Sequence, residues 1–391
     1  MRNYSKNINF LFVPFVCGLI STLSLPPYNF FYLNFITFPI LLLFYLNLEI
    51  KKSFSSFLYG WIFGFAYFVS NIYWIANSLT VEEIFKPLIP FAITIIPLFL
   101  GIFYGISFLI FFYFKPRKKI VSIFLFALIF SIIEYLRGHI LGGFPWNLIS
   151  FSLVGINEFI QILSYVGTYS LNLLVITIFL VPAVVLFNVP SKAKLITVLL
   201  TVTLIISNLI FGNLVLNKHN NTPNSPMNTI VKIISPKIDL KRFFDGTDPS
   251  LVIKDLAEIG NIDSRDALYI YPEGILPSIN LNEIQDYSSV FGNYFQNNHK
   301  IIVGITRYKE TEIFNSMALL DNDLKLISVY DKNKLVPFGE YLPFENFLKN
   351  YGFKKITQGY QSFSSASERD LIKMNDTKFL PLICYEIIYS G

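Results

Sequence analysis

Residues 195–216 read LITVLLTVTLIISNLIFGNLVL, and residues 217–228 continue directly with NKHNNTPNSPMN. The first part has no charged side chain and is longer than the roughly 20 apolar residues that a helix needs to cross a bilayer. The second part is rich in Asn, Pro and Ser, which favour turns and end a membrane helix. This change of character predicts a transmembrane domain at residues 1–217 and a second domain at residues 218–391.

The composition of the whole chain is that of a membrane protein. Hydrophobic residues make up 53% and aromatic residues 17% of its 391 residues, well above the average of soluble proteins. The first apolar run has the basic start of a signal peptide but no clear cleavage site, so we interpret it as a retained helix. By hydropathy, helices are predicted near residues 9–25, 30–48, 56–79, 88–114, 120–137, 157–188 and 195–216.

Basic side chains occur in every second loop between these predicted helices. They are Lys51 and Lys52, the KPRKK sequence at 115–119, and Lys192 with Lys194. By the positive-inside rule these loops lie in the cytoplasm, together with the N-terminus. An odd number of spans then places the second domain on the extracytoplasmic side, which is the periplasm in a bacterium with two membranes. Since the cations are clustered in this way, the net charge of +5 does not indicate a nucleic-acid partner.

The chain has two cysteines, Cys17 in the first apolar run and Cys384 in the second domain. A disulfide between them would have to join the membrane interior to water, so we expect two free thiols. Cys384 is therefore available for chemistry outside the membrane.

Three stretches of the second domain each combine a short apolar, strand-like run with a reactive side chain. They are ALYIYPEG at 267–274, LISVYDKNKLVPFGEY at 326–341 and FLPLICYE at 379–386. The ends of strands often present functional groups, because the strand fixes the position and the following turn exposes the side chain. The sequence therefore presents a carboxylate at Glu273, an amine at Lys332 and a thiol at Cys384.

These three groups are sufficient for covalent acyl transfer. A thiolate attacks a carbonyl carbon, a carboxylate removes the thiol proton, and an ammonium group stabilises the developing oxyanion. We expect Cys384 to be the nucleophile, Glu273 the base and Lys332 the cation. Lys334 is a second candidate cation, but in an extended segment it points to the opposite face from Lys332. Taken singly, each stretch also fits a structural interpretation: a buried thiol, a common turn and a solvated hairpin tip.

The order YPE, YxKxxLVPFGEY and CYE resembles the nitrilase or carbon-nitrogen hydrolase superfamily, whose Glu, Lys and Cys follow the same order along the chain. More narrowly, the seven preceding spans, the LRG...GFPWN loop at 136–147 and LVPFGEYLP at 335–343 resemble the apolipoprotein N-acyltransferase family of the bacterial inner membrane. The resemblance covers essentially the whole chain. It implies a multi-pass α-helical membrane domain followed by a nitrilase-like α/β domain, an αββα sandwich, that works as a monomer without cofactor or metal.

The resemblance also implies roles for individual residues of the second domain. Glu273 corresponds to the general base, Lys332 to the oxyanion stabiliser and Cys384 to the nucleophile that accepts the acyl group. The supporting positions are Glu340, a further carboxylate beside the lysine, and Tyr385 and Glu386, which follow the cysteine.

The loop between the fifth and sixth predicted helices allows two interpretations. From its residues alone, it is an interfacial aromatic anchor with a glycine turn. Through the resemblance, it matches a family segment at the membrane surface that shapes the lipid entrance. The residues concerned are Gly143, Phe144, Pro145, Trp146 and Asn147.

The reaction that the resemblance implies is the last step of lipoprotein maturation. The Cys384 thiolate attacks an acyl ester of a membrane phospholipid, which leaves a thioester and releases a lysophospholipid. The free α-amine of the N-terminal diacylglyceryl-cysteine of an apolipoprotein then attacks the thioester and becomes an amide. Two alternatives stay open, a membrane-tethered amidase that passes the acyl group to water and a non-catalytic remnant. A transporter is disfavoured, because the spans have almost no ionisable residue at mid-membrane.

The sequence departs from the family pattern in two respects. Family chains continue well beyond their cysteine, so the resemblance implies that the nitrilase-like domain is incomplete at Gly391. Near the first strand, Lys237, Leu240 and the pair Phe243 and Phe244 stand where the family usually has Asn, Gln and Trp, and Tyr271 replaces a common Trp.

Overall fold

A computed structural model of the chain describes residues 2–48, 50–80, 83–221, 229–236, 246, 248–276, 279–337, 339–342, 362–374 and 377–389, with side chains from residue 9 onward. The chain forms two compact units, Met1–Pro223 and Asn224–Tyr389. The last helix of the first unit runs to Asn221, about one turn past the predicted boundary at residue 217. Lys218 lies in that last turn, where the helix dipole favours a cation.

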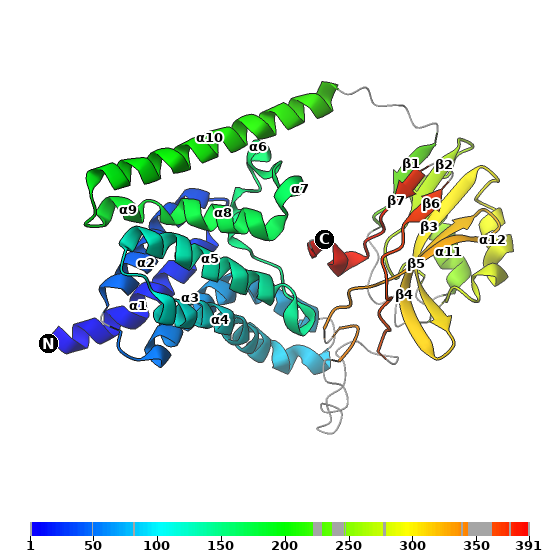
Figure 1. Cartoon of the computed structure of the whole chain (residues 1–391). Coiled ribbons are helices and arrows are strands. Elements are labelled where there is room, and N and C mark those ends of the chain that lie inside the picture. Colours follow the sequence, from blue (N-terminus) through cyan, green and yellow to red (C-terminus); the bar gives the residue numbers. More distant parts are fainter. Residues whose placement is uncertain are drawn as a thin grey trace. The chain divides into compact units, whose positions relative to one another are not determined.

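The first unit is a bundle of α-helices (Figure 1). Its longer helices are α1 (Arg2–Thr22), α2 (Asn34–Asn47), α3 (Ser53–Ile72), α4 (Ile89–Phe114), α5 (Lys119–Arg137), α8 (Thr168–Leu180) and α10 (Ser191–Asn221). Short helices are α6 (Asn157–Ile160), α7 (Leu163–Val166) and α9 (Ala183–Leu186). Turns of 3₁₀ helix lie at Phe31–Leu33, Tyr73–Thr80, Glu83–Leu88, Ile140–Gly142 and Ile149–Leu153.

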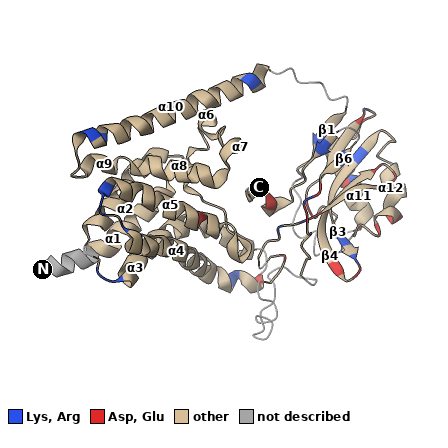
Figure 2. Ribbon diagram, in the orientation of Figure 1, with Lys and Arg blue, Asp and Glu red and all other residues tan. Residues whose placement is uncertain are grey.

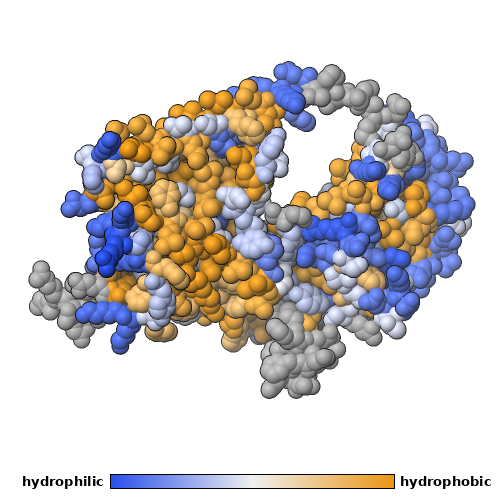
Figure 3. Space-filling view, viewed as in Figure 1, coloured by the Kyte–Doolittle hydropathy of each residue, from blue (hydrophilic) through white to orange (hydrophobic). Residues whose placement is uncertain are grey.

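Several of these helices have the length and composition of membrane spans. Four segments are long and apolar enough, Glu83–Phe114, Lys119–Arg137, Thr168–Leu186 and Ser191–Asn221, and Asn9–Thr22 and Phe31–Asn47 are shorter apolar helices. In α10 only 17% of the most apolar window is buried, so most of its apolar side chains lie at the surface. Figure 3 shows a largely hydrophobic surface over the visible face of this unit. Such a surface is stable in lipid and not in water, which identifies a membrane protein.

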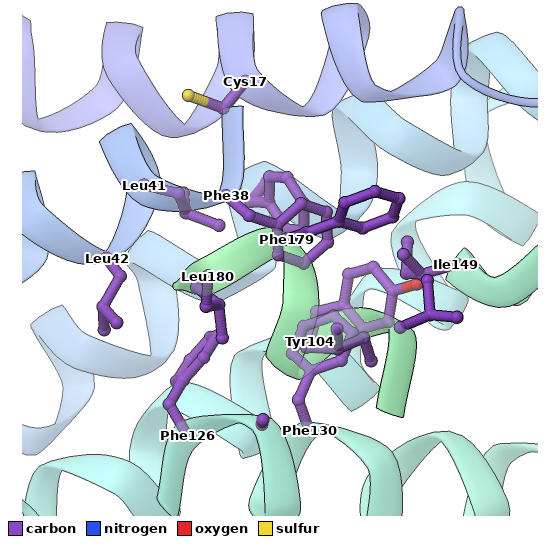
Figure 4. Packing of buried hydrophobic residues seen from close by; sticks show 14 of the residues in the cluster. Cys17, Phe38, Leu41, Leu42, Tyr104, Phe126, Phe130, Ile149, Phe179 and Leu180 are labelled. Carbon is purple, nitrogen blue, oxygen red and sulfur yellow. The ribbon is translucent and has the colours of Figure 1, made fainter. Parts of the chain in front are cut away.

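Aromatic side chains form much of the core of the first unit. Phe38 of α2 lies 6.3 Å from Phe179 of α8 and 6.2 Å from Phe130 of α5, measured between ring centroids. The rings of Tyr104 and Phe130 lie 4.5 Å apart. Figure 4 shows these rings meeting from different helices. Because lipid is as apolar as these side chains, the helices are held together by close packing more than by exclusion of water.

Glycines allow α3 and α4 to approach each other closely. A Cβ atom at Gly64 would lie 2.8 Å from the Cα of Gly101, and one at Gly60 would lie 2.5 Å from the carbonyl oxygen of Tyr104. No side chain fits at either position without moving the neighbouring helix. Small residues at such crossings are typical of helix pairs in membranes.

The predicted single helix at 157–188 is wrong, because the structure divides this stretch into α6, α7, α8 and α9. Gly167 separates α7 from α8 with a φ of 78°, a backbone conformation that glycine adopts far more readily than other residues. Pro182 precedes α9 and cannot donate the backbone hydrogen bond that a continuous helix requires. Hydropathy does not reveal these breaks, because the residues around them are apolar.

The basic loops of the first unit gather at one end of the bundle. The Nζ atom of Lys115, which follows α4, lies 5.7 Å from the ring centroid of Tyr45 near the end of α2. The Nζ atom of Lys119 at the start of α5 lies 5.8 Å from the ring centroid of Phe187, which follows α9. The end of α2, the start of α5 and the end of α9 therefore lie close together, and few charged residues occur along the helices between the two ends (Figure 2).

The last helix of the first unit runs from this basic end to the other end. Lys194, in the first turns of α10, donates a 2.7 Å hydrogen bond to a carbonyl of α9. Further along α10, the Asn208 amide donates to the Phe159 carbonyl at 2.9 Å, and a Cβ atom at Gly212 would lie 1.7 Å from the Glu158 carbonyl oxygen. At about 1.5 Å per residue, Asn208 lies on the order of 20 Å along the helix from Lys194. The chain therefore leaves α10 at the end opposite to the basic loops.

The second unit contains a five-stranded sheet in the order β1-β2-β3-β4-β5. The strands are β1 (Ile230–Ile233), β2 (Ala267–Ile270), β3 (His299–Lys309), β4 (Glu312–Asp321) and β5 (Leu326–Asp331). β1, β2 and β3 are parallel neighbours, whereas β3, β4 and β5 are antiparallel neighbours. The remaining elements are α11 (Pro249–Gly260), α12 (Ser288–Gly292), 3₁₀ turns at Ile284–Tyr287 and Cys384–Ile388, and an antiparallel hairpin of β6 (Ile372–Met374) and β7 (Thr377–Phe379).

The two faces of the sheet bury different sets of side chains, because successive residues of a strand point to opposite faces. Tyr269 of β2 and Ile301 of β3 share a buried cluster with α11 and α12. Their sequence neighbours Leu268 and Ile302 belong to a cluster with β6 on the other face. Apolar helices followed by a mixed sheet with this layering confirm the predicted fold class, a helical membrane unit with a nitrilase-like α/β unit.

Candidate active site

The predicted reactive residues of the second unit lie just beyond strands. Glu273 follows β2 after an intervening Tyr-Pro pair, and Lys332 follows β5 directly. Cys384 begins the 3₁₀ turn Cys384–Ile388, a few residues after β7. Strands β3 and β4 lie between β2 and β5, and residues of both complete the site.

Gly304 of β3 leaves room for the backbone of Glu273. A Cβ atom at position 304 would lie 2.4 Å from the Glu273 Cα and 3.0 Å from its backbone nitrogen. Both atoms belong to the backbone, so they cannot rotate away as a flexible side chain could. The lack of a side chain at Gly304 is therefore one condition for the position of the Glu273 carboxylate.

Lys332 lies between two carboxylates. Its Nζ atom is 3.0 Å from Oε1 of Glu340 and 3.5 Å from Oε1 of Glu273, and its side chain is 1% exposed. Burial alone would lower the pKa of Lys332, but the charges of Glu273 and Glu340 outweigh burial and raise it. Lys332 is therefore a buried ammonium ion at neutral pH, paired on both sides.

Asn315 of β4 joins the same two carboxylates, and the sequence analysis did not identify it. Its Nδ2 atom donates to Oε1 of Glu273 and, at 2.7 Å, to Oε1 of Glu340. The backbone carbonyl oxygen of Asn315 accepts a 2.8 Å hydrogen bond from the backbone nitrogen of Lys332. The available signal was an amide side chain inside a strand that is otherwise mostly buried and apolar.

Glu340 shapes the loop that follows Lys332. Its Oε2 atom accepts a 2.8 Å hydrogen bond from the backbone nitrogen of Val336, and its own backbone nitrogen donates to the Val336 carbonyl at 2.9 Å. Since Oε1 contacts Lys332 and Asn315, both oxygens of this carboxylate are occupied. The predicted supporting carboxylate thus lies beside Lys332.

Cys384 completes the group. The residue is exposed, and the Glu273 carboxylate lies close enough to its thiol to affect the pKa of the sulfur. Burial of the sulfur and the nearby Glu273 charge raise the pKa of Cys384. The charge of Lys332 lowers this pKa, but its effect is smaller, so the net shift is upward. The resting group is therefore a thiol, and forming the thiolate requires a base at hand. The backbone of Cys384 has a φ of 48°, in the left-handed region.

Glu386 holds the cysteine turn to the end of β5. Its Oε1 atom accepts hydrogen bonds from the backbone nitrogens of Asn333 and Lys334, at 2.8 and 3.0 Å, and from the Tyr330 hydroxyl at 2.7 Å. Its Oε2 atom accepts from the backbone nitrogen of Ile383 at 2.9 Å. The carboxylate is fully buried, so these donors replace its water shell. Burial and the hydrogen bond to Glu386 raise the pKa of Tyr330, which keeps this phenol a donor.

The remaining predicted residues of the second unit have other surroundings. Tyr385 is mostly buried, and its ring lies 5.3 Å from that of Tyr389. The rival cation Lys334 places its Nζ atom 5.9 Å from the ring centroid of Tyr389. Among the described residues, the lysine that contacts the two carboxylates is therefore Lys332.

Two further expectations concern departures from the family pattern. Tyr271 is buried, and its hydroxyl donates a 3.0 Å hydrogen bond to the Leu256 carbonyl of α11, so this residue serves the core. Burial is the main cause that raises the pKa of this phenol. Lys237, Leu240, Phe243 and Phe244 lie outside the described residues.

The predicted lipid-entrance segment, residues 143–147, belongs to the first unit and is held by side chains of α3 and α5. Arg137 donates hydrogen bonds to the carbonyls of Phe144 and Trp146. The Tyr67 hydroxyl donates to the Asn147 carbonyl at 2.9 Å. Pro145 stands between the two carbonyls bound by Arg137, and Gly143 has a positive φ of 72°.

The second unit thus brings together a thiol, a nearby carboxylate, and an ammonium ion held by a further carboxylate. This combination can form a thiolate, stabilise an oxyanion and return a proton to a leaving group. Within the part of the chain that the structure describes, no group of three or more His, Cys, Asp or Glu side chains is arranged to hold a metal ion.

Comparisons with known protein families match both units. The family model described as "Apolipoprotein N-acyltransferase N-terminal domain" matches residues 17–181. The family model described as "Carbon-nitrogen hydrolase" matches residues 294–391, which contain Lys332 and Cys384.

Curated relatives cover nearly the whole chain. A protein of Rhizobium meliloti (strain 1021) named "Apolipoprotein N-acyltransferase" is 28% identical over 405 residues, which is 97% of this chain and 74% of the relative. Its namesake in Rhodopseudomonas palustris (strain ATCC BAA-98 / CGA009) is 30% identical over 409 residues, 96% of this chain and 74% of that protein. Another in Brucella melitensis biotype 1 is 28% identical over 398 residues, 96% of this chain and 73% of that protein.

Proposed function

This chain belongs to the apolipoprotein N-acyltransferase family, and from that premise we propose that Cys384 carries the transferred acyl group as a thioester. The family and the carbon-nitrogen hydrolase domain identify an acyltransferase that acts in lipoprotein N-acylation. The observation that carries the proposal is the position of the Lys332 ammonium group, 3.5 Å from Glu273 and 3.0 Å from Glu340, with the Cys384 thiol near the same groups.

The first half-reaction loads the cysteine. Glu273 takes the proton of Cys384, and the sulfur attacks an ester carbonyl of a membrane phospholipid. The carbonyl oxygen becomes an oxyanion, which the Lys332 ammonium stabilises because this group is buried and fixed between two carboxylates. As the C–O bond breaks, Glu273 returns the proton to the leaving oxygen. The products are a lysophospholipid and the acyl thioester of Cys384.

The second half-reaction transfers the acyl group to an amine. The free α-amine of an N-terminal diacylglyceryl-cysteine attacks the thioester carbonyl, and Glu273 takes a proton from the attacking nitrogen. Lys332 stabilises the oxyanion a second time. The C–S bond breaks, the sulfur regains a proton from Glu273, and the acceptor leaves as an amide. The free thiol is thereby restored for the next cycle.

The supporting residues act through these three groups. Glu340 and Asn315 hold Lys332 and Glu273 by hydrogen bonds, so they fix the cation relative to the base. Glu386 fixes the turn that carries Cys384, and Tyr385 packs within the same turn. All these groups come from one chain, and we therefore propose that the monomer is the active unit.

Attachment to a membrane suits a reaction whose two substrates are both lipid-anchored. Moving an acyl chain from lipid to water costs about 0.8 kcal/mol per methylene, or on the order of 10 kcal/mol for a long chain. A site at the membrane surface avoids this cost. The segment 143–147 carries Phe144 and Trp146, and we propose that it contributes to the lipid entrance.

We further propose that the second unit faces the periplasm across the bacterial inner membrane. Lys115 and Lys119 lie at one end of the helical bundle, and α10 leaves the bundle at the other end. By the positive-inside rule, the basic end with the N-terminus faces the cytoplasm. In the same proposal, residue 217 divides the membrane domain from the catalytic domain.

The experiment that tests the mechanism is to trap the acyl-enzyme. The full chain in nanodiscs of ester phospholipid, without acceptor, is digested and analysed by mass spectrometry. We expect one acyl group on the peptide that contains Cys384, none in Cys384→Ala, and an unchanged yield in Cys17→Ala. An adduct on another residue, or no adduct in a folded protein, would overturn the mechanism. Adding a diacylglyceryl-peptide then separates amide formation from release of free fatty acid, which would indicate an amidase.

A further inference from the structure

The first unit buries an ion pair that takes no part in the proposed chemistry. Arg137 and Glu134, one turn apart near the end of α5, both have fully buried side chains. Arg137 donates from Nε to Oε2 of Glu134 at 3.2 Å and also from Nη2 to the same oxygen. Charged side chains inside a membrane protein are costly, so they are generally kept for a specific task.

The remaining donor group of Arg137, Nη1, binds the segment 143–147. Nη1 donates to the Phe144 carbonyl and, at 2.9 Å, to the Trp146 carbonyl. The Arg137 carbonyl in turn accepts a 2.8 Å hydrogen bond from the backbone nitrogen of Phe144. One residue of α5 therefore binds the segment 143–147 through its side chain and its backbone. Glu134 compensates the charge of the guanidinium and fixes its orientation.

The segment needs these hydrogen bonds because its backbone carbonyls are not paired within a helix or a strand. Gly143 and Asn147 have φ values of 72° and 57°, so the segment forms neither helix nor strand. Carbonyl groups outside regular structure are expensive near the membrane interior unless another group binds them. Arg137 binds the carbonyls of residues 144 and 146, and Tyr67 of α3 binds that of Asn147 at 2.9 Å.

The two aromatic rings of the segment are half-buried, and Phe144 packs against the buried cluster of the helical bundle. The ring of Trp146 lies 5.2 Å from that of Trp74, edge to face, and 5.9 Å from that of Phe144. Trp74 is 41% exposed, and Tyr73, which precedes it, is 59% exposed. Ile140 and Leu141, which follow α5, are 44% and 57% exposed. These exposed side chains follow α3 and α5, at the same end of the bundle as the segment. An apolar surface of this composition fits a long acyl chain with its ester group at the water boundary.

We propose that Arg137, paired with Glu134, is a positioning residue that fixes Trp146 and Phe144 for contact with the acyl chain of the phospholipid donor. This inference rests on the proposed function of the segment as part of the lipid entrance. Arg137 itself is buried and touches no substrate. Arg137 instead determines the fraction of molecules in which the rings of Trp146 and Phe144 are held in position for the acyl chain.

The choice of variants follows from the energetics of buried charges. Removing one partner alone leaves an unpaired buried charge, which destabilises the fold for reasons unrelated to positioning. Arg137→Lys keeps the charge beside Glu134 but loses the planar fork that binds Glu134 and two carbonyls at once. The double variant Glu134→Gln with Arg137→Met removes both charges and both carbonyl contacts. Arg117→Lys, in an exposed loop, is the matched control.

The first measurement follows Trp146 without any reaction. In full-length protein carrying Trp61→Phe and Trp74→Phe, Trp146 is the remaining tryptophan, and acrylamide quenching of its fluorescence in nanodiscs reports its fixation. We expect increased quenching in Arg137→Lys and in the double variant at unchanged helix content, and no change in Arg117→Lys. Unchanged quenching in both folded variants would overturn the positioning role.

The second measurement connects position to substrate. Nanodiscs contain ester phospholipid diluted into ether-linked phospholipid, which has no acyl ester to donate, and acylation of Cys384 is followed as the ester fraction rises. We expect Arg137→Lys to raise the half-saturating ester fraction on the order of tenfold with little change in the limiting rate. If quenching of Trp146 increases but the half-saturating ester fraction stays unchanged, the proposal that Trp146 helps to bind the phospholipid donor is overturned. Failure of the proposed function itself differs, because Cys384 of the unaltered chain would then not be acylated at any fraction.

Discussion

The Glu386 carboxylate accepts a 2.7 Å hydrogen bond from the Tyr330 hydroxyl, and through this bond the turn that carries the thiol is fixed to the strand that carries the ammonium ion. Tyr330 lies two residues before Lys332, and Glu386 two residues after Cys384. The predicted nucleophile and the predicted cation are therefore connected through one buried carboxylate.

Glu386→Gln is expected to destabilise this connection. A glutamine amide has one oxygen, so when that oxygen serves the donors of Oε1, its NH₂ group faces the Ile383 N–H, another donor. Leaving buried donors unpaired costs about 1–3 kcal/mol. Thermal unfolding should show the loss, and acylation of Cys384 should slow. Glu368→Gln, at an exposed position, is the control, and equal behaviour of the two variants would contradict the connecting role.

The reactivity of the thiol should respond to Glu273 in opposite directions in two assays. Burial and Glu273 raise the pKa of Cys384, so at neutral pH the group is a thiol that gains thiolate only as the pH rises. Removing the charge in Glu273→Gln lowers the pKa of Cys384 and should speed alkylation by iodoacetamide at a fixed, mildly alkaline pH. The same variant lacks the base and should acylate roughly 100- to 10,000-fold more slowly. Parallel changes in both rates would contradict this assignment.

Lys332→Met supplies the complementary test. Lys332 lowers the pKa of Cys384, so its removal should shift the alkylation profile to higher pH, opposite to the effect of Glu273→Gln. Acylation should also fall, by roughly 100- to 1,000-fold, because the oxyanion loses its stabilising charge. The measurement is the rate of alkylation against pH in a Cys17→Ala background. A shift of the profile to lower pH would contradict the place of Lys332 beside the sulfur.

Asn315 should prove necessary although its side chain neither gains nor loses a proton. Asn315→Ala removes a donor from two carboxylates, and hydrogen bonds to charged groups contribute about 1.5–3 kcal/mol each. Asn315→Asp should be worse, because it adds a third negative charge beside Glu273 and Glu340. Thermal unfolding and acylation rate are measured together, with Asn322→Ala as the control in the turn after β4. The reverse order of the two variants would argue against the bridging role.

Gly304→Ala tests whether the backbone position of Glu273 matters. The new methyl group would meet the Glu273 Cα at 2.4 Å, and relieving such an overlap typically costs about 1–3 kcal/mol. Displacement of the base should reduce acylation beyond what the loss of stability explains. Gly292→Ala is the matched control, since a Cβ atom there meets nothing within 4 Å. Normal acylation by folded Gly304→Ala would show that the close approach is unimportant.

The sequence predicted those parts of the structure that depend on local patterns. The two units divide between Pro223 and Asn224, within the polar stretch 217–228, and the apolar runs before Glu273 and Lys332 contain strands β2 and β5. The break at Gly167 was not predicted, because an isolated glycine in an apolar run is equally compatible with an uninterrupted membrane helix.

Contacts between distant segments were the part that the sequence could not supply. Asn315 reaches Glu273 and Glu340 only because β4 lies beside β3 and β5, and strand order is not encoded in the spacing of polar residues. The same holds for Arg137 and the carbonyl of Trp146, which meet only when the chain after α5 folds back on itself. The sequence therefore predicted Glu273, Lys332 and Cys384 as a group, but it did not predict the contacts that Asn315 and Arg137 make.

The left-handed backbone of Cys384 implies that the fold loses some stability at the position that supplies the thiol. A side chain in this conformation costs about 1–2 kcal/mol that glycine does not incur, although glycine also gains about 0.4–1 kcal/mol of freedom when the chain unfolds. Cys384→Gly should thus melt at or above the temperature of Cys384→Ala, while both are inert. The enzyme thus keeps a strained backbone conformation at residue 384, where glycine would be more stable, because the position carries the sulfur atom.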